Sequence, residues 1–113
     1  MFPLLDTHQH LIYPEIASYG WTQNSPLLKG KPFTLQDYQA AAQGLTIQSS
    51  LFMEVAVDEP CIEAETNFVS KLAADSENNI KGLIATCRPE TNEGFGQWLE
   101  KAPELGIVGY RRL

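Results

Sequence analysis

The sequence predicts an α/β protein built on a parallel β-sheet, and two patterns support this fold class. Short apolar runs recur along the chain, and segments with helical spacing of apolar residues lie between them. Strands that alternate with helices of roughly 10–15 residues are typical of right-handed βαβ units. Four strands without a closing element leave two architectures open, a small open sheet and half of a (β/α)₈ barrel.

Size and charge limit the classes of partner. The 113 residues form a single predicted domain, 1–113, with 43% hydrophobic residues and a net charge of -6. Nucleic acid and anionic membrane surfaces are disfavoured, because phosphate binding needs a basic face. With no spanning segment or leader pattern, we expect a cytoplasmic protein. Cys61 and Cys87 are expected to be reduced thiols.

The first half of the chain predicts one strand, a long connection and one helix. The strand covers residues 3–8, and the irregular segment 11–33 that follows contains four aromatic residues. Loops longer than about 15 residues are usually functional or disordered, and the aromatic content favours an ordered loop that folds over a site. Thr34, with Asp37 in the first turn, predicts the start of a helix over 35–43.

The second half repeats the pattern. The near-continuous apolar run at 50–57 predicts a strand buried on both faces, and residues 58–60 open a second helix. A third strand is expected over 80–87, a helix near 93–102 and a fourth strand over 107–113.

The two histidines of the chain are separated by a single residue at the end of the first strand. Alternation along a strand would place Asp6, His8 and His10 on one face, with the imidazoles side by side. This arrangement suits metal ligands, although a pair of surface histidines is the alternative. A catalytic zinc site usually has three protein ligands, so the pair needs a third ligand from a carboxylate, a cysteine or another chain.

Several short motifs follow one another in a fixed order. They are Asp6-Thr7-His8-Gln9-His10-Leu11, Tyr19-Gly20-Trp21, Phe52-Met53-Glu54-Val55, Cys87-Arg88-Pro89-Glu90 and Gly109-Tyr110-Arg111-Arg112. In this order the chain resembles the N-terminal part of the amidohydrolase-related TIM-barrel hydrolases, particularly the branch that contains lactonases. The resemblance implies a half barrel of about four βα units.

The resemblance also implies a function. His8 and His10 would bind a divalent metal, with zinc as the first choice, although some members of the lactonase branch work without one. The reaction would be attack of water on a lactone or a related carboxylate-bearing ester, a small-molecule substrate. Arg88 and Arg111 would bind the substrate carboxylate at the strand ends, and Tyr19 and Trp21 would line the pocket.

Each of these residues has a structural alternative. Glu54 is the catalytic candidate, as a ligand, base or hydrogen-bond acceptor, but it could equally be a carboxylate paired with an arginine. The two arginines could form ion pairs between strands, and the two loop aromatics could simply pack.

The chain as a whole also has two interpretations. It is either part of a longer hydrolase or a non-catalytic α/β domain that homo-oligomerises and binds a metal or an anion. Both interpretations expect the unpaired sheet edges to be covered by a second copy or by further chain.

Overall fold

The structure is a computed structural model that describes residues 2–90 and 95–113. Its strands are β1 (Leu4–Gln9), β2 (Ile47–Met53), β3 (Ile80–Thr86) and β4 (Ile107–Arg111). They form one parallel sheet in the order β1-β2-β3-β4. Because neighbours in the sheet are also neighbours in the sequence, the strands are arranged like four consecutive strands of a barrel. The predicted fold class, an α/β half barrel, is confirmed.

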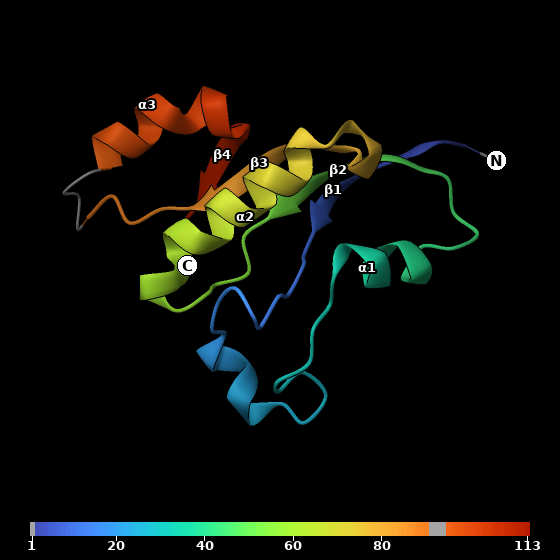
Figure 1. Ribbon diagram of the computed structural model, residues 1–113, viewed down its shortest axis with the longest axis horizontal. Helices are drawn as coiled ribbons and strands as arrows, with labels where there is room; N and C mark the ends of the chain where they lie inside the picture. The colour runs from blue at the N-terminus through green and yellow to red at the C-terminus, as the bar shows by residue number, and fades with distance from the viewer. Residues whose placement is uncertain (1, 91–94) are drawn as a thin grey trace.

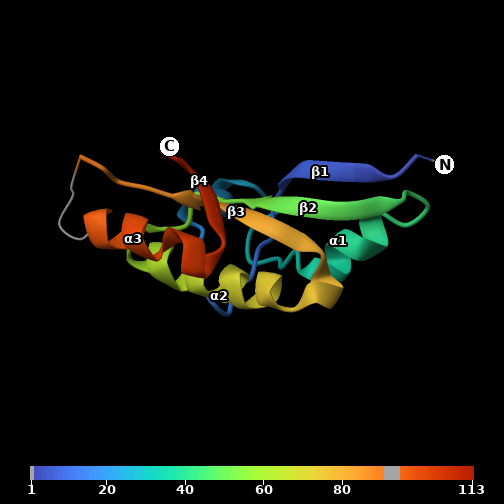
Figure 2. The same cartoon turned by 90° about the horizontal axis from the view of Figure 1, so that it is seen from above.

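Three α-helices cover one face of this sheet (Figures 1 and 2). They are α1 (Leu35–Ala41), α2 (Ile62–Ala74) and α3 (Phe95–Leu105), and short 3-10 turns occur at η1 (Gly20–Asn24), η2 (Glu59–Cys61) and η3 (Ser76–Asn78). Within the described ranges, no helix has both the length and the apolar character needed to span a membrane.

The element boundaries agree with the sequence pattern at some positions and differ at others. The start of α1 is as predicted, with a capping box in which Thr34 and Asp37 bind each other's backbone N–H groups. The strand predicted over 50–57 instead begins at Ile47 and ends at Met53. Ala56 has a φ of 50°, a left-handed conformation that is incompatible with a strand continuing to residue 57. Of the helix predicted near 93–102, positions 93 and 94 lie outside the described residues.

The hydrophobic core lies between the sheet and the helices. Phe52 of β2 and Leu83 of β3 are 1% and 0% exposed, and they pack beside Val69 of the central helix α2. Burial of each such side chain stabilises the fold by about 1.5–3 kcal/mol. The helices therefore depend on this face of the sheet, which accounts for the two-layer form of the molecule.

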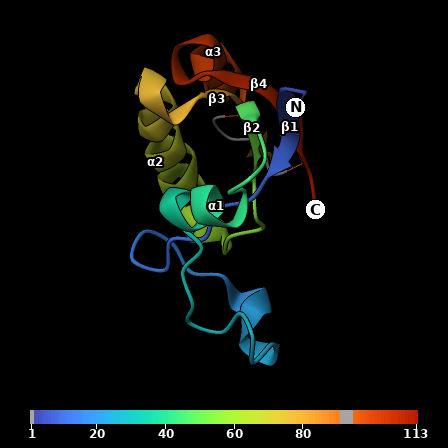
Figure 3. The ribbon, with the colours of Figure 1, turned by 90° about the vertical axis from the view of Figure 1, so that its right-hand side faces the viewer.

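None of the helices described covers the other face of the sheet (Figures 2 and 3). Val108 of β4 contacts Gly82 of β3 so closely that a Cβ on Gly82 would lie 2.9 Å from a Val108 methyl group. Leu5 of β1 and Val108 are 58% and 62% exposed. We call this surface the free face, defined by Leu5, Leu51, Gly82, Ile84 and Val108.

The segment 11–33 folds into an ordered unit beyond the C-terminal end of β1 (Figure 3). A backbone bridge between Ile12 and Phe33 closes its base. The carboxylate of Asp58 accepts hydrogen bonds from Ser18 Oγ at 2.6 Å and from the backbone N–H of Gly20 at 3.1 Å. These contacts hold the segment against the chain that leaves β2, which is where an active site would lie in a barrel.

Candidate functional site

The two histidines meet at the C-terminal end of β1. The Nε2 atoms of His8 and His10 are 2.9 Å apart, and the rings are arranged edge to face. His10 Nδ1 lies 2.9 Å from the carbonyl oxygen of Met53, which only accepts hydrogen bonds. His10 therefore carries its proton on Nδ1 when neutral and directs the lone pair of Nε2 at His8. His8 Nε2–H then donates a hydrogen bond to His10 Nε2, so the two Nε2 atoms lie together beside β1.

The Asp6 carboxylate forms its hydrogen bonds with groups other than the two imidazole rings. The strand register shifts between Asp6 and Gln9, and Gln9 is buried. The Asp6 carboxylate accepts hydrogen bonds from the Tyr38 hydroxyl of α1 at 2.6 Å and from the His8 backbone N–H. Burial, together with this hydrogen bond, raises the pKa of Tyr38 to about 12, so the hydroxyl remains a donor. The expectation that Asp6 shares the face of both histidines stays a prediction.

Glu54 is buried at the end of β2 with both carboxylate oxygens engaged. Its Oε1 accepts a hydrogen bond from Arg111 Nε at 2.6 Å, and its Oε2 accepts from Thr86 Oγ1 and the backbone N–H of Ala56. Arg111 Nη2 also donates to the Glu54 carbonyl oxygen. These contacts join the ends of β2, β3 and β4, and they match the structural alternative for Glu54. Its catalytic role stays a prediction.

Glu65 of α2 is a second buried carboxyl that the sequence analysis missed. It is 4% exposed, and neither carboxyl oxygen has a well-formed hydrogen bond. Burial, then the nearby charge of Glu54, raises its pKa from 4.5 to about 8, with the Val55 backbone and Arg111 offsetting part of the shift. The helical spacing did indicate this burial. Glu65 follows Ile62 by three residues and precedes Val69 by four, which places it on the buried face of the helix.

The two arginines belong to separate ion pairs. Arg88 Nε is 3.2 Å from Glu59 Oε1 in η2, and its Nη1 donates to the Cys87 carbonyl oxygen. Arg111 is held by Glu54, with 29% of its side chain exposed. Both arrangements match the ion-pair alternative, and the substrate-binding role stays a prediction. Arg111 is nonetheless partly open to solvent, and it lies at the C-terminal end of β4 as the histidines lie at the C-terminal end of β1.

The two loop aromatics have different environments. Tyr19 is buried, and its hydroxyl accepts the backbone N–H of Tyr13 at 2.9 Å. It also forms part of the wall of a cavity of about 210 Å³ inside the 11–33 segment, next to Ser18 and Lys31. Trp21 is 47% exposed and donates its indole N–H to the Val55 carbonyl oxygen, so it lies over the chain that leaves β2.

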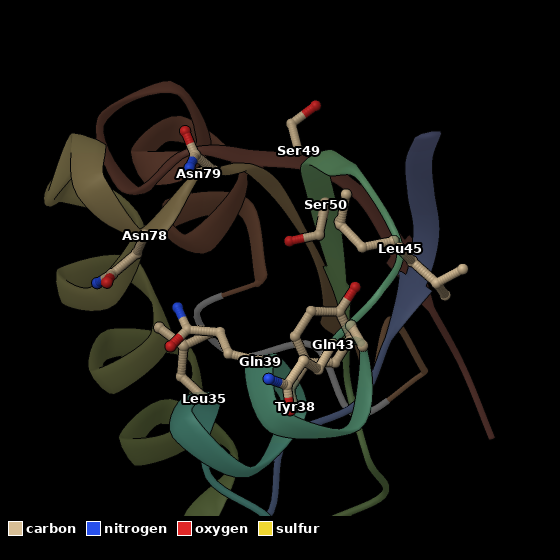
Figure 4. Close-up of a pocket in the computed structure, with 11 residues that line it drawn as sticks. Leu35, Tyr38, Gln39, Gln43, Leu45, Ser49, Ser50, Asn78 and Asn79 are labelled. Atoms are coloured by element: carbon tan, nitrogen blue, oxygen red, sulfur yellow. The ribbon is translucent and has the colours of Figure 1, made fainter. Parts of the chain in front are cut away.

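A second cavity of about 210 Å³ lies at the opposite end of the sheet, beside the start of β2 (Figure 4). Gln39 and Ser50 point into it, and the rest of its wall is apolar or uncharged. It contains no residue that the sequence analysis selected. The histidine end therefore remains the candidate site.

The described residues supply part of a metal site. Across positions 2–90 and 95–113, no three side chains of His, Cys, Asp or Glu come together as a possible metal cluster. His8 and His10 fit a metal by their chemistry, because a backbone carbonyl orients one ring, as is common for histidine ligands. A third ligand would have to come from elsewhere.

Comparison with known proteins supports the fold. The chain is similar in structure to a solved protein described as "Amidohydrolase 2 from Bifidobacterium longum subsp. infantis", with a TM-score of 0.62 and 21% sequence identity. The match covers 78% of this chain and 34% of that one, so this chain corresponds to about a third of the solved protein. No protein-family model and no curated protein matches the sequence. The likeness establishes a partial barrel fold of the kind seen in that solved protein.

Proposed function

We propose that this chain supplies the first four strands of a metal-dependent hydrolase barrel of the amidohydrolase-related type. The observation that carries the proposal is the convergence of His8 Nε2 and His10 Nε2, 2.9 Å apart, at the C-terminal end of β1. Active sites of barrel enzymes lie at this end of the strands. The likeness to a solved protein named as an amidohydrolase supports the same reaction class.

In this proposal His8 and His10 would hold a zinc ion, and the rest of the barrel would complete the site. Imidazole nitrogen is a common zinc ligand, and His10 is already oriented by the Met53 carbonyl oxygen. When bound, the metal would polarise the substrate carbonyl or lower the pKa of a bound water molecule to about 7. The substrate class is a lactone or a related ester that carries a carboxylate, acted on in the cytoplasm.

The other residues at this end bind and orient. Arg111 presents the exposed part of its guanidinium to a substrate carboxylate, and Glu54 keeps that guanidinium in place through Oε1 at 2.6 Å. Trp21, anchored on Val55, shields the site from water. Arg88 provides a second positive charge near the end of β3.

Zinc binding tests the proposal. The protein is incubated with zinc, freed of excess metal by gel filtration and measured by elemental analysis. Wild type, with two of the ligands in place, is expected to retain more zinc than the double variant His8→Ala/His10→Ala. Thr7→Ala is the matched control, because Thr7 directly precedes His8, is exposed and should leave the zinc content unchanged.

A lactone panel follows with the zinc-loaded protein. Hydrolysis that disappears in the double variant and persists in Thr7→Ala supports the proposed reaction. Equal zinc content in wild type and in the double variant would overturn the assignment of the histidines.

A further inference from the structure

We propose that the cavity beside the start of β2 binds a small uncharged molecule that carries several hydroxyl groups on one ring, such as a monosaccharide or a cyclic polyol. The cavity lies at the opposite end of the sheet from the histidines, so the inference does not rest on the metal site proposed above. Every described residue that lines it falls between positions 35 and 79. The supporting features are an unpartnered buried hydroxyl group, an uncharged polar wall and the size of the space.

The floor of the cavity contains a buried hydroxyl group without a partner. Ser50 of β2 is 3% exposed, and its side chain points into the cavity (Figure 4). Its backbone N–H donates to the Asn79 carbonyl oxygen at 2.9 Å, but its Oγ forms no hydrogen bond with any group of the residues that the structure describes. Buried hydroxyl groups are normally hydrogen-bonded, because leaving one unpaired costs free energy. Ser50 can therefore donate to a molecule held in the cavity and accept from it.

Side-chain amides lie on two sides of this hydroxyl group. Gln39 of α1 and Gln43 of the turn that follows α1 lie on one side, and Asn78 and Asn79 at the end of η3 lie on the other. Asn78 Nδ2 donates to a backbone carbonyl oxygen of α2 at 2.8 Å, which leaves its Oδ1 as an acceptor. Because an amide group offers both donors and an acceptor, this set matches ligand hydroxyl groups, which also donate and accept.

Charge favours a neutral ligand. Among the described residues that line the cavity, none has a charged side chain. A carboxylate, phosphate or ammonium group would lose part of its hydration on entering and would gain no opposite charge in return. The chain also has a net charge of -6, which further disfavours an anion. A ligand without charge avoids both costs.

The size of the cavity fits a single ring. Leu35 and the aromatic ring of Tyr38 form an apolar side, since the Tyr38 hydroxyl is bound to the Asp6 carboxylate at 2.6 Å. Ligand sites typically combine such apolar surface with a few placed polar groups. A cavity of about 150 Å³ holds benzene, so this cavity of about 210 Å³ holds one six-membered ring with small substituents. A monosaccharide has such a ring, with hydroxyl groups at its edge and C–H groups on its faces.

An NMR titration of the isotope-labelled chain in metal-free buffer tests the inference. The neutral probes are myo-inositol, glucose and galactose. The comparison probes are cyclohexanol, which has a similar ring with a single hydroxyl group, and inositol monophosphate, which adds charge to the ring. We expect saturable shifts of the backbone amide signals around the cavity with at least one neutral probe, and weaker binding of both comparison probes.

Two variants locate the binding. Ser50→Ala and Gln39→Met each remove one polar group and should weaken binding about five-fold, which corresponds to one net hydrogen bond. Ser76→Ala is the matched control, because Ser76 is exposed, lies outside the cavity wall and should leave the affinity unchanged. Since the Ser50 hydroxyl has no partner in the chain, Ser50→Ala should not lower the urea midpoint of unfolding.

Each contrary outcome overturns a stated part of the inference. The absence of saturable shifts with all three neutral probes would overturn the site itself. Equal affinity for cyclohexanol would mean that hydrogen bonding does not contribute, and tighter binding of inositol monophosphate would mean that the ligand is an anion. Unchanged affinity in both Ser50→Ala and Gln39→Met would place the binding elsewhere, and a lower urea midpoint for Ser50→Ala would show that its hydroxyl is partnered. The zinc measurement is separate, so the two proposals can fail independently.

Discussion

Glu65→Gln removes a buried acid from α2 at nearly constant shape, and its effect should depend on pH. The pKa of Glu65 is about 8 in the folded protein, against an ordinary value of 4.5. Between these pH values the folded state keeps a proton that the unfolded state has released. Stability is therefore lost as pH rises from about 4.5 to about 8, at up to about 1.4 kcal/mol per pH unit. Over the whole interval the loss has an upper limit of about 5 kcal/mol.

Urea denaturation followed by far-UV circular dichroism, at pH 5, 6, 7 and 8 and at fixed protein concentration, measures this effect. Glutamine does not titrate, so the free energy of unfolding of Glu65→Gln minus that of wild type should increase steadily across this series. Glu63→Gln is the matched control, since Glu63 lies in the same helical turn, is exposed and should give a constant difference. A constant difference for Glu65→Gln as well would refute the reasoning, because it would mean that Glu65 is solvated or well partnered in the folded state.

Further predictions concern the start of α1, the core and the buried ion pair. Thr34→Ala removes one side of the capping box and should lower the free energy of unfolding by about 1 kcal/mol, with Gln36→Ala, at an exposed site, as the control. Phe52→Ala, at a fully buried site beneath the helices, should cost about 3–5 kcal/mol in the same urea assay, and a cost below about 1 kcal/mol would contradict the packing described. Arg111→Met leaves the Glu54 carboxylate buried without its ion pair and should cost about 3–5 kcal/mol. Adding Glu54→Gln to Arg111→Met should restore part of that loss, and no recovery would argue against a direct pair.

The sequence predicted those features that depend on local patterns. Apolar runs marked the strands, and Thr34 with Asp37 marked the start of α1 because the capping box involves residues only three apart. The strand at 50–57 was misplaced: β2 ends at Met53, and periodicity could not reveal the left-handed backbone of Ala56 three residues later. Such backbone conformations depend on tertiary contacts as well as on residue type.

The candidate site was predicted only in outline. The C-terminal ends of the strands were expected to meet, and this brings Glu54 and Arg111 together across 57 residues of sequence. The sequence pattern could not decide whether Glu54 is a catalytic acid or part of a structural ion pair. Alternation places Asp6 with the histidines, but it could not show that the Asp6 carboxylate binds the Tyr38 hydroxyl of α1 and the His8 backbone N–H. Glu65 was overlooked because glutamate in a first helical turn normally faces solvent.

The strictly sequential strand order has a consequence for how the protein is made. Each strand pairs with the strand that precedes it in the chain, so no segment waits for a distant one before it can add to the sheet. Each loop that closes joins consecutive strands, so the entropy lost on closing it is smaller than for any strand order that skips a strand. During synthesis the sheet can therefore grow one strand at a time from the N-terminus, and β1, which carries the histidine pair, is in place before β3 and β4 have left the ribosome.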